Sequence, residues 1–203
     1  VYNITEKATV NKPRRSRGTN VYYKGGSSPN IEPFVIGGVS GTLGINTDDE
    51  LIVETNDQYY ICDSCGFGCT GKIPKTHKSA FKTDCKGRLS PMKLGHVFRT
   101  DVAIIHLNDR NQAISVLYSI IEALCIDIQV ERSEISGCVR ILEDGTVDYI
   151  LFDNTPGGSG YVKAINVEML PHLIEDALKI VSSCDCGGNQ GDSSCYRCIQ
   201  SYY

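Results

Sequence analysis

Two pairs of closely spaced cysteines near the end of the chain could bind a metal ion. One residue separates Cys184 from Cys186, two separate Cys195 from Cys198, and eight residues rich in glycine and polar side chains lie between the pairs. Zn²⁺ takes four thiolates in a tetrahedron, and such short spacings let one tight turn supply two of them. The loop between the pairs is too polar to hold a shape by packing. The spacing therefore predicts a zinc knuckle at these four cysteines.

Three other interpretations of these thiols are structural disulfides, unrelated buried cysteines and a redox site. Disulfides are typical of oxidising compartments, and no signal peptide is recognisable in the sequence. Buried thiols do not usually gather in a loop of glycine and serine, and a redox Cys-x-x-Cys of the thioredoxin kind has no second pair beside it. We therefore favour zinc. Because the ten cysteines fall into metal knuckles or apolar segments, we expect a reducing, cytoplasmic location.

A second candidate metal site begins at Cys62 and Cys65, which are two residues apart and are followed by the glycine that such a knuckle needs. His77 and Cys85 are the best placed residues to complete the tetrahedron. Cys69 is the rival of His77, but it would lie on the same turn as Cys65, whereas a structural site usually closes a loop with a distant pair. Free thiols are the alternative. The sequence thus predicts one zinc ion and allows a second.

Basic residues gather in the first half of a chain whose net charge is −4. Residues 1–99 carry 14 Lys and Arg against 9 Asp and Glu, whereas residues 100–203 carry 6 against 15. A basic face attracts polyanions, so the stretch 72–99 is a candidate DNA-binding surface, with a solvated face as the alternative. The residues that we expect to contact nucleic acid are Lys72, Lys75, Lys78, Lys82, Lys86 and Arg88, with Arg14, Arg15 and Arg17 as further candidates.

The spacing of apolar side chains predicts the strands that position the first cysteine pair. Short strands are expected at 34–36, 51–53 and 58–61, and the turn at 55–57 should join the last two as a hairpin. A long strand is expected at 94–107, central in its sheet where it is continuously apolar.

Two further strands, 135–142 and 147–153, should form a hairpin because the dipeptide Asp144-Gly145 lies between them. Cys138 lies in the first of these strands and is expected to be a core thiol.

Two amphipathic helices complete the expected fold. Apolar residues at steps of three and four predict a helix at 113–128, capped by Asn108 or Asp109, and a second helix at 166–183 that leads into the C-terminal knuckle. Cys125 lies on the apolar stripe of the first helix. The chain is thus predicted to be an α+β domain with a mostly antiparallel sheet, two packed helices and one or two zinc knuckles.

The glycine-rich stretch 154–161 has two interpretations. Its N–H groups could bind a phosphate of DNA, or it could be a tight strand-to-helix turn in which a side chain would clash, which we favour. A nuclease or hydrolase that uses Asp153, Ser159 and His172 or His96 is the enzymatic alternative, for which the residue types are present without evidence of geometry.

Six segments of the chain together resemble a known family. They are YICDSCG, LGHVFRTDV, SVLYSIIEAL, ILFDNTPGGSGYV, CDCGG and CYRCIQSYY, in this order between Tyr60 and Tyr203. In order and motif they are similar to the zinc-binding C-terminal domain of MrfA-type DNA helicases, which is shared with DrmB-type proteins of bacterial phage defence.

The resemblance implies an accessory domain that binds zinc, contacts or positions DNA, and works with a DEAD/DEAH-type helicase core in cis or in trans, in DNA repair or phage restriction. Cys184, Cys186, Cys195 and Cys198 match the family's zinc ligands, whereas Cys62, Cys65, His77 and Cys85 match a second cluster seen in defence-type members. Because the chain has no helicase motif, we do not expect it to hydrolyse ATP on its own.

The expected organisation has two parts. Residues 1–59 form N-terminal strands and a basic linker, and residues 60–203 form the zinc-binding domain, which divides into a first knuckle (62–85), a core (94–183) and a C-terminal knuckle (184–198). No apolar run is long enough to cross a bilayer, so no membrane partner is expected. A protein-interaction module without nucleic-acid contact is the alternative function.

Overall fold

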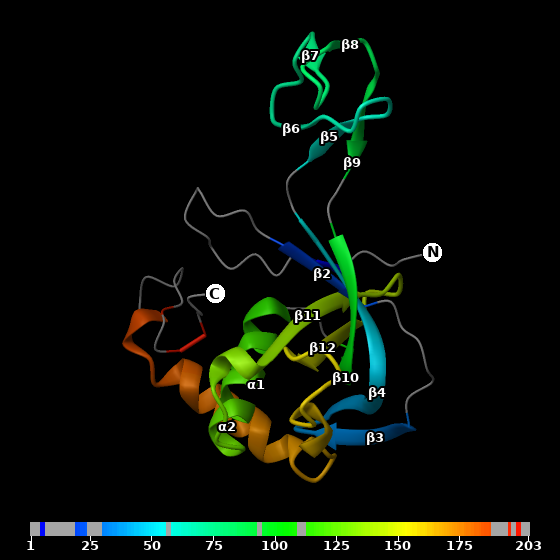
Figure 1. The fold of residues 1–203 in the computed structure, drawn as a ribbon. Helices are drawn as coiled ribbons and strands as arrows, with labels where there is room; N and C mark the ends of the chain where they lie inside the picture. The colour runs from blue at the N-terminus through cyan, green and yellow to red at the C-terminus, as the bar shows by residue number, and fades with distance from the viewer. Residues whose placement is uncertain are drawn as a thin grey trace. The chain divides into compact units, whose positions relative to one another are not determined.

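The computed structural model describes residues 5–6, 19–23, 30–55, 58–92, 95–108, 113–187, 195 and 198–199. They belong to two compact units, which we call the knuckle unit and the sheet unit (Figure 1). Of the described residues, those within Val53–His96 and Lys12–Asn20 form the knuckle unit, and those within Val1–Asn11, Val21–Ile52 and Val97–Tyr203 form the sheet unit. The expected boundary between residues 59 and 60 stays a prediction.

The sheet unit is built on a sheet of seven strands in the order β1-β11-β12-β10-β4-β2, with β3 paired to β4. The neighbours β1–β11, β11–β12, β12–β10 and β3–β4 are antiparallel, which confirms the predicted fold class. The strands are β1 (Thr5–Glu6), β2 (Thr19–Tyr23), β3 (Asn30–Ile36), β4 (Val39–Thr55), β10 (Gly95–Leu107), β11 (Ile135–Ile141) and β12 (Val147–Asp153).

The hairpin of β11 and β12 has the predicted turn. Ile141 pairs with Val147 at its end, and Gly145 takes a φ of 86°, a conformation that glycine adopts without strain. Asp144 accepts a hydrogen bond from the Thr146 backbone N–H at 2.9 Å. A local turn therefore fixes the register of these strands.

Two helices, α1 (Ala113–Asp127) and α2 (Leu170–Ser182), pack against each other, and α1 also packs on β11 and β12 (Figure 1). α2 begins four residues later than predicted because the Asn166 side chain accepts the Met169 N–H at 2.9 Å and closes a separate turn first. The predicted cap of α1, Asn108 or Asp109, stays a prediction, because residues 109–112 lie outside the described residues.

Both faces of β12 are covered, as its central place in the sheet requires. Tyr149 and Leu151 belong to a cluster that includes the buried sides of α1 and α2. Ile150 and Phe152 belong to a second cluster on the other face, with Leu51 of β4. All seven residues of the strand are buried, so β12 is the centre of the unit's core.

The predicted hairpin of 51–53 with 58–61 is wrong. Leu51 is fully buried in the sheet unit and belongs to the 17-residue strand β4, which turns back onto β3 at Gly37 and Gly38, with φ of 58° and 83°. The following segment instead forms β5 (Tyr59–Cys62), which pairs with other strands. The tight glycine turn placed the true hairpin earlier in the chain than expected.

The knuckle unit contains two small sheets. β5 lies between β6 and β9, and β7 pairs with β8. Their bounds are β6 (Gly68–Thr70), β7 (His77–Lys78), β8 (Asp84–Cys85) and β9 (Leu89–Met92). Both hydrophobic core clusters found among the described residues lie in the sheet unit. Something other than an apolar core must therefore hold the knuckle unit together.

Candidate metal centres

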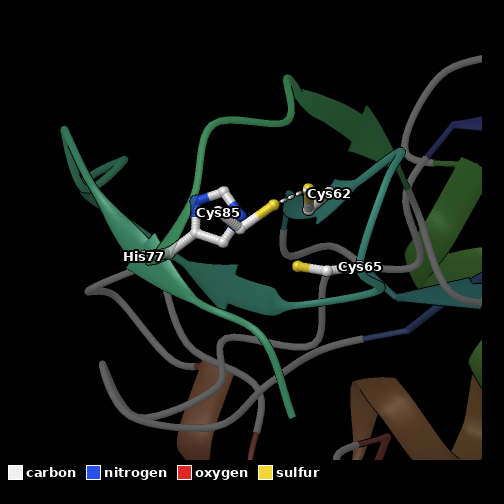
Figure 2. A group of neighbouring side chains, drawn as sticks. All are labelled: Cys62, Cys65, His77 and Cys85. Atoms are coloured by element: carbon white, nitrogen blue, oxygen red, sulfur yellow. Dashed lines mark hydrogen bonds between the residues drawn. The ribbon is translucent and has the colours of Figure 1, made fainter. Parts of the chain in front are cut away.

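The structure brings Cys62, Cys65, His77 and Cys85 together in the knuckle unit. One ligand atom from each lies within 4.8 Å of every other, and the sulfurs of Cys62 and Cys85 are 3.7 Å apart. Figure 2 shows the four side chains converging on one space from β5, the turn after it, β7 and β8. The two small sheets thus bring into one site Cys62 and Cys85, which are 23 positions apart in the chain.

Tight backbone turns aim N–H groups at these sulfurs. The Ser64 N–H donates to the Cys62 sulfur at 3.4 Å, and the Gly87 N–H donates to the Cys85 sulfur at 3.3 Å. Gly66 turns the first knuckle with a φ of 71°. Gly87 closes the second, because a Cβ there would overlap the Cys62 sulfur. Sequence reasoning missed Gly87, although Cys-x-Gly was its signal.

His77 has the environment of a metal ligand. Its side chain is 9% exposed and its ring stacks on Phe67, with centroids 4.9 Å apart. Its buried Nε2 has no hydrogen-bond partner among the described residues. Buried polar nitrogens are rarely left unpaired, so this atom fits a coordinated ion. The rival Cys69 lies on β6, where it pairs with Tyr60 of β5, and it is not in the group of four.

The environment of Cys62 favours the thiolate that a metal needs. Burial opposes ionisation, but the backbone N–H groups of Ser64 and Cys65 outweigh it, and the pKa of Cys62 is lowered from 9.0 to about 6. This cysteine is thus prepared to bind a cation before the ion arrives.

The second group, Cys184, Cys186, Cys195 and Cys198, lies in the sheet unit directly after α2. Their sulfurs are separated by 3.3 Å between Cys184 and Cys186, by 3.5 Å between Cys184 and Cys195 and between Cys186 and Cys198, and by 3.9 Å between Cys195 and Cys198. The Cys195 N–H donates to the Cys198 sulfur at 3.3 Å.

These separations fit a zinc tetrahedron. A Zn–S bond of about 2.3 Å gives sulfur–sulfur edges of about 3.8 Å, close to the distances in both groups. Hydrogen bonds with the sulfurs of Cys184 and Cys198, together with burial, raise the pKa of the Cys186 thiol to about 12. A divalent cation reverses this effect by pairing with all four thiolates. The zinc prediction therefore agrees with the geometry of both groups.

The predicted DNA-contacting residues are exposed in the knuckle unit. They are Lys72, Lys75, Lys78, Lys82, Lys86 and Arg88. Arg99, the last basic residue of the stretch 72–99, belongs to the sheet unit and donates to Asp48 at 2.9 Å. Arg14, Arg15 and Arg17 lie outside the described residues.

The glycine-rich loop does bind an anion, but the anion is a side chain of the same unit. The carboxylate of Asp153 accepts backbone N–H groups from the four residues 159–162, at 2.5 to 3.1 Å. Gly158 takes a φ of 77°, and a Cβ there would overlap the carboxyl group of Asp101. The favoured interpretation, a tight turn where a side chain would clash, is therefore confirmed, and these N–H groups are already paired.

The same contacts weaken the enzymatic alternative. Asp153 is fully buried, and both of its carboxylate oxygens hold backbone N–H groups of the loop. Ser159 contributes one of these N–H groups. His96 on β10 and His172 on α2, the histidines that the alternative names, are exposed. The carboxylate that the enzymatic alternative requires is thus already hydrogen-bonded to the backbone of the loop.

No helix of the described chain has both the length and the apolar character needed to span a membrane.

Comparisons with known proteins agree with these features. Residues 116–199 match the model of the MrfA Zn-binding domain. The Druantia protein DruE of Escherichia coli (strain UMEA 4076-1) is 27% identical over 143 residues, which cover 59% of this chain and 8% of that protein. A crystal structure of the DUF1998 helicase MrfA bound to DNA has the same fold, with a TM-score of 0.51 and 13% identity over 92% of this chain and 23% of that one.

The chain therefore spans a small part of each of these proteins. The matched range contains all four cysteines of the second group, whereas the first group lies before it. The resemblance predicted from the motifs is confirmed, and residues 116–199 are matched by the MrfA Zn-binding domain family.

Proposed function

We propose that the chain is a zinc-binding accessory domain of a DNA helicase system, and that it contacts DNA and the helicase core in phage defence or DNA repair. The observation that carries this proposal is that each compact unit holds one group of four ligands, all within 4.8 Å of one another. Cys62, Cys65, His77 and Cys85 would bind one zinc ion. The second ion would be bound by Cys184, Cys186, Cys195 and Cys198.

The zinc ions in this proposal are structural. Each group supplies four protein ligands. Four ligands complete the tetrahedral coordination of Zn²⁺ and leave no position for water or substrate. The ion would replace the apolar core that the described part of the knuckle unit lacks. In the reducing cytoplasm that we propose for this chain, the thiolates stay available to zinc.

DNA contact is supported by the charge of the knuckle unit. Between residues 58 and 92 six basic side chains are exposed, against the acidic residues Asp63 and Asp84. The carboxylate of Asp63 already accepts a hydrogen bond from the Ser90 hydroxyl at 2.9 Å. A local positive excess on a small unit is typical of a surface that contacts phosphates.

The relatives support a helicase context. One is a helicase that was crystallised with DNA, and the other is the Druantia protein DruE. Because this chain matches only a fraction of each, a helicase core would act with it either in the same polypeptide or as a separate partner. Defence and repair are both compatible with these relatives.

A DNA titration tests the proposal. Fluorescence anisotropy of the full chain with labelled DNA at low salt should show binding that is independent of sequence, and its affinity should fall by about tenfold or more over a few-fold rise in salt. Reversing Lys78, Lys82 and Lys86 together to Glu should weaken binding to all sequences alike. Two single reversals are matched in charge. Lys82→Glu lies in the basic stretch, whereas Lys179→Glu, at an exposed position of α2, should bind DNA normally.

Failure of this titration would favour the alternative, a protein-interaction module. Ile31 and Val35 of β3 are 60% and 71% exposed and lie on the same side of the strand. Exposed aliphatic residues on a strand are a feature of protein contacts. If wild-type protein binds no DNA at low salt, the lysines are a solvated face and this module becomes the better explanation.

A further inference from the structure

We propose that Phe81, at the tip of the hairpin between β7 and β8, stacks on an unpaired base of single-stranded DNA. The inference rests on the proposed DNA contact of the knuckle unit and adds which form of DNA the unit selects. Phe81 is 89% exposed and has the largest exposed fraction among the exposed large hydrophobic residues of the described chain. A phenyl ring that stays this exposed adds almost no apolar burial on folding, so its position on the surface needs another explanation.

The backbone holds Phe81 in a defined position. The Ser79 N–H donates to the Thr83 carbonyl oxygen and the Lys82 N–H to the Ser79 carbonyl oxygen, both at 2.9 Å. The hydroxyls of Ser79 and Thr83 are 2.7 Å apart. Lys82 takes a φ of 62°, which a lysine adopts only at a cost. The turn is therefore a fixed structure that presents the ring.

Both ends of this hairpin lie at the first metal site. His77 pairs with Cys85 across β7 and β8, and both belong to the group of four ligands. A bound zinc ion would fix the base of the hairpin and hence the direction of its tip. Such preorganisation lowers the entropy that binding would otherwise cost.

The surroundings of Phe81 suit a nucleotide. The ring borders an open hollow of about 750 Å³, which Thr83 and Lys86 line together with the metal ligands Cys65 and Cys85. Lys78 and Lys82 are exposed on the same hairpin. A ring for the base and ammonium groups for the phosphates are the two parts of surfaces that bind single strands.

The geometry favours single-stranded DNA over duplex DNA. In a duplex both faces of each base are already stacked, so a protruding ring could reach a base face only by paying to unstack a base step. In a single strand every base has a free face, and stacking on an aromatic side chain tolerates any sequence. The lysines alone would bind both forms, and Phe81 would add affinity for the single strand.

The first test removes the ring. Phe81→Ala in the full chain should weaken anisotropy binding of labelled oligodeoxythymidine of about 20 nucleotides by about five- to a hundredfold. Binding of a duplex of equal length should be unchanged. Ile73→Ala, which removes another exposed apolar side chain of the same unit, should leave both affinities unchanged. Zinc content, measured for each protein, should equal that of the wild type.

The second test reports on stacking itself. The chain contains no tryptophan, so Phe81→Trp introduces a single indole that can be excited selectively. Its emission should be quenched as oligodeoxythymidine saturates the protein, and affinity should be retained. Leu178→Trp, at an exposed position of α2, should give no quenching.

The outcomes separate this inference from the proposed function. If the lysine reversals weaken binding but Phe81→Ala does not, or if Phe81→Ala weakens duplex binding equally, or if the introduced indole is not quenched, Phe81 does not stack and the DNA contact remains. If the wild-type protein binds neither DNA at low salt, both ideas fail.

Discussion

Gly158 lies against the side chain of Asp101 so closely that a Cβ at this position would overlap the carboxyl group. Asp101 is 3% exposed and forms an ion pair with Lys163 at 2.9 Å. The neighbouring Gly157 also has a positive φ, 88°, yet a Cβ there would meet nothing within 4 Å. Substitutions at these two glycines therefore distinguish the cost of a positive φ from the cost of steric overlap.

We expect Gly158→Ala to destabilise the protein clearly more than Gly157→Ala. Both changes place alanine at a positive φ, which costs about 1–2 kcal/mol. Gly158→Ala must also displace the buried carboxylate of Asp101, which should add about 2 kcal/mol or more. Urea unfolding at constant zinc would measure both. Equal losses would show that the loop moves away from Asp101 at little cost.

Asp153→Asn should destabilise the loop that follows β12. The carboxylate accepts the N–H groups of Ser159, Gly160 and Tyr161 on one oxygen and that of Val162 on the other. An asparagine offers one acceptor and turns its own N–H groups toward backbone donors, so we expect a loss of about 3 kcal/mol or more. Urea unfolding measures it. Asp144→Asn, in an exposed turn, is the control and should lose far less.

Purified protein should carry two equivalents of zinc by metal analysis, and Cys195→Ser should carry one. Because the polar loop folds around its ion, losing that ion should also speed amide hydrogen exchange at the end of α2, near Ser182. Cys125→Ser, which alters a buried thiol of α1, should retain both equivalents. Less than one equivalent in wild-type protein prepared without chelator would contradict the C-terminal site.

His77→Ala should remove the zinc ion of the knuckle unit, whereas Cys69→Ser should keep it. The reason is the position of the two side chains, since His77 lies in the group of four and Cys69 does not. The same metal analysis decides, with Cys85→Ser as the variant that must lose the ion in either case. The opposite pattern, with loss in Cys69→Ser alone, would reverse the ligand assignment.

The stability of the protein should fall in mild alkali because of Cys138. Burial raises the pKa of this thiol from 9.0 to about 12, so the folded protein keeps a proton that the unfolded chain releases. The free energy of unfolding should therefore fall by about 1 kcal/mol between about pH 8 and about pH 10 on account of this group. In Cys138→Ala the fall should be smaller by that amount. Val139→Ala, a buried change without a titrating group, should keep the wild-type pH dependence.

The features that were predictable from the sequence are those set by neighbouring residues. The cysteine spacings indicate both ligand groups because one turn supplies each pair, and Asp144-Gly145 fixes the β11–β12 hairpin for the same reason. His77 was a weaker inference from spacing alone, and the structure places it beside the sulfurs.

The long strand β4 was not predictable in this way. Asn46 and Asp49 interrupt its apolar pattern, yet both are buried, at 3% and 2% exposed. They are satisfied by Tyr23, whose hydroxyl donates to Asp49 at 2.6 Å and accepts from Asn46 at 2.9 Å. The partner lies 23 to 26 residues away, so no local window could show that these polar residues belong in a sheet.

The loop around Asp153 shows another limit. The glycines indicated a tight turn, but they did not show that an acidic residue just before them would take the N–H groups. The signal was a carboxylate at the end of a strand followed by glycines, a combination in which the chain can solvate its own charge.

The order of the strands also decides when the sheet can assemble. Its neighbours β11, β12 and β10 come from residues 95–153, whereas β2 and β4 come from residues 19–55. During synthesis the earlier strands therefore leave the ribosome before the strands that complete their sheet exist. The β3–β4 and β11–β12 hairpins have local contacts and can form early, whereas β4 must close a long loop to reach β10. Until that closure, the emerging chain exposes strand edges that a chaperone or a second chain can pair with.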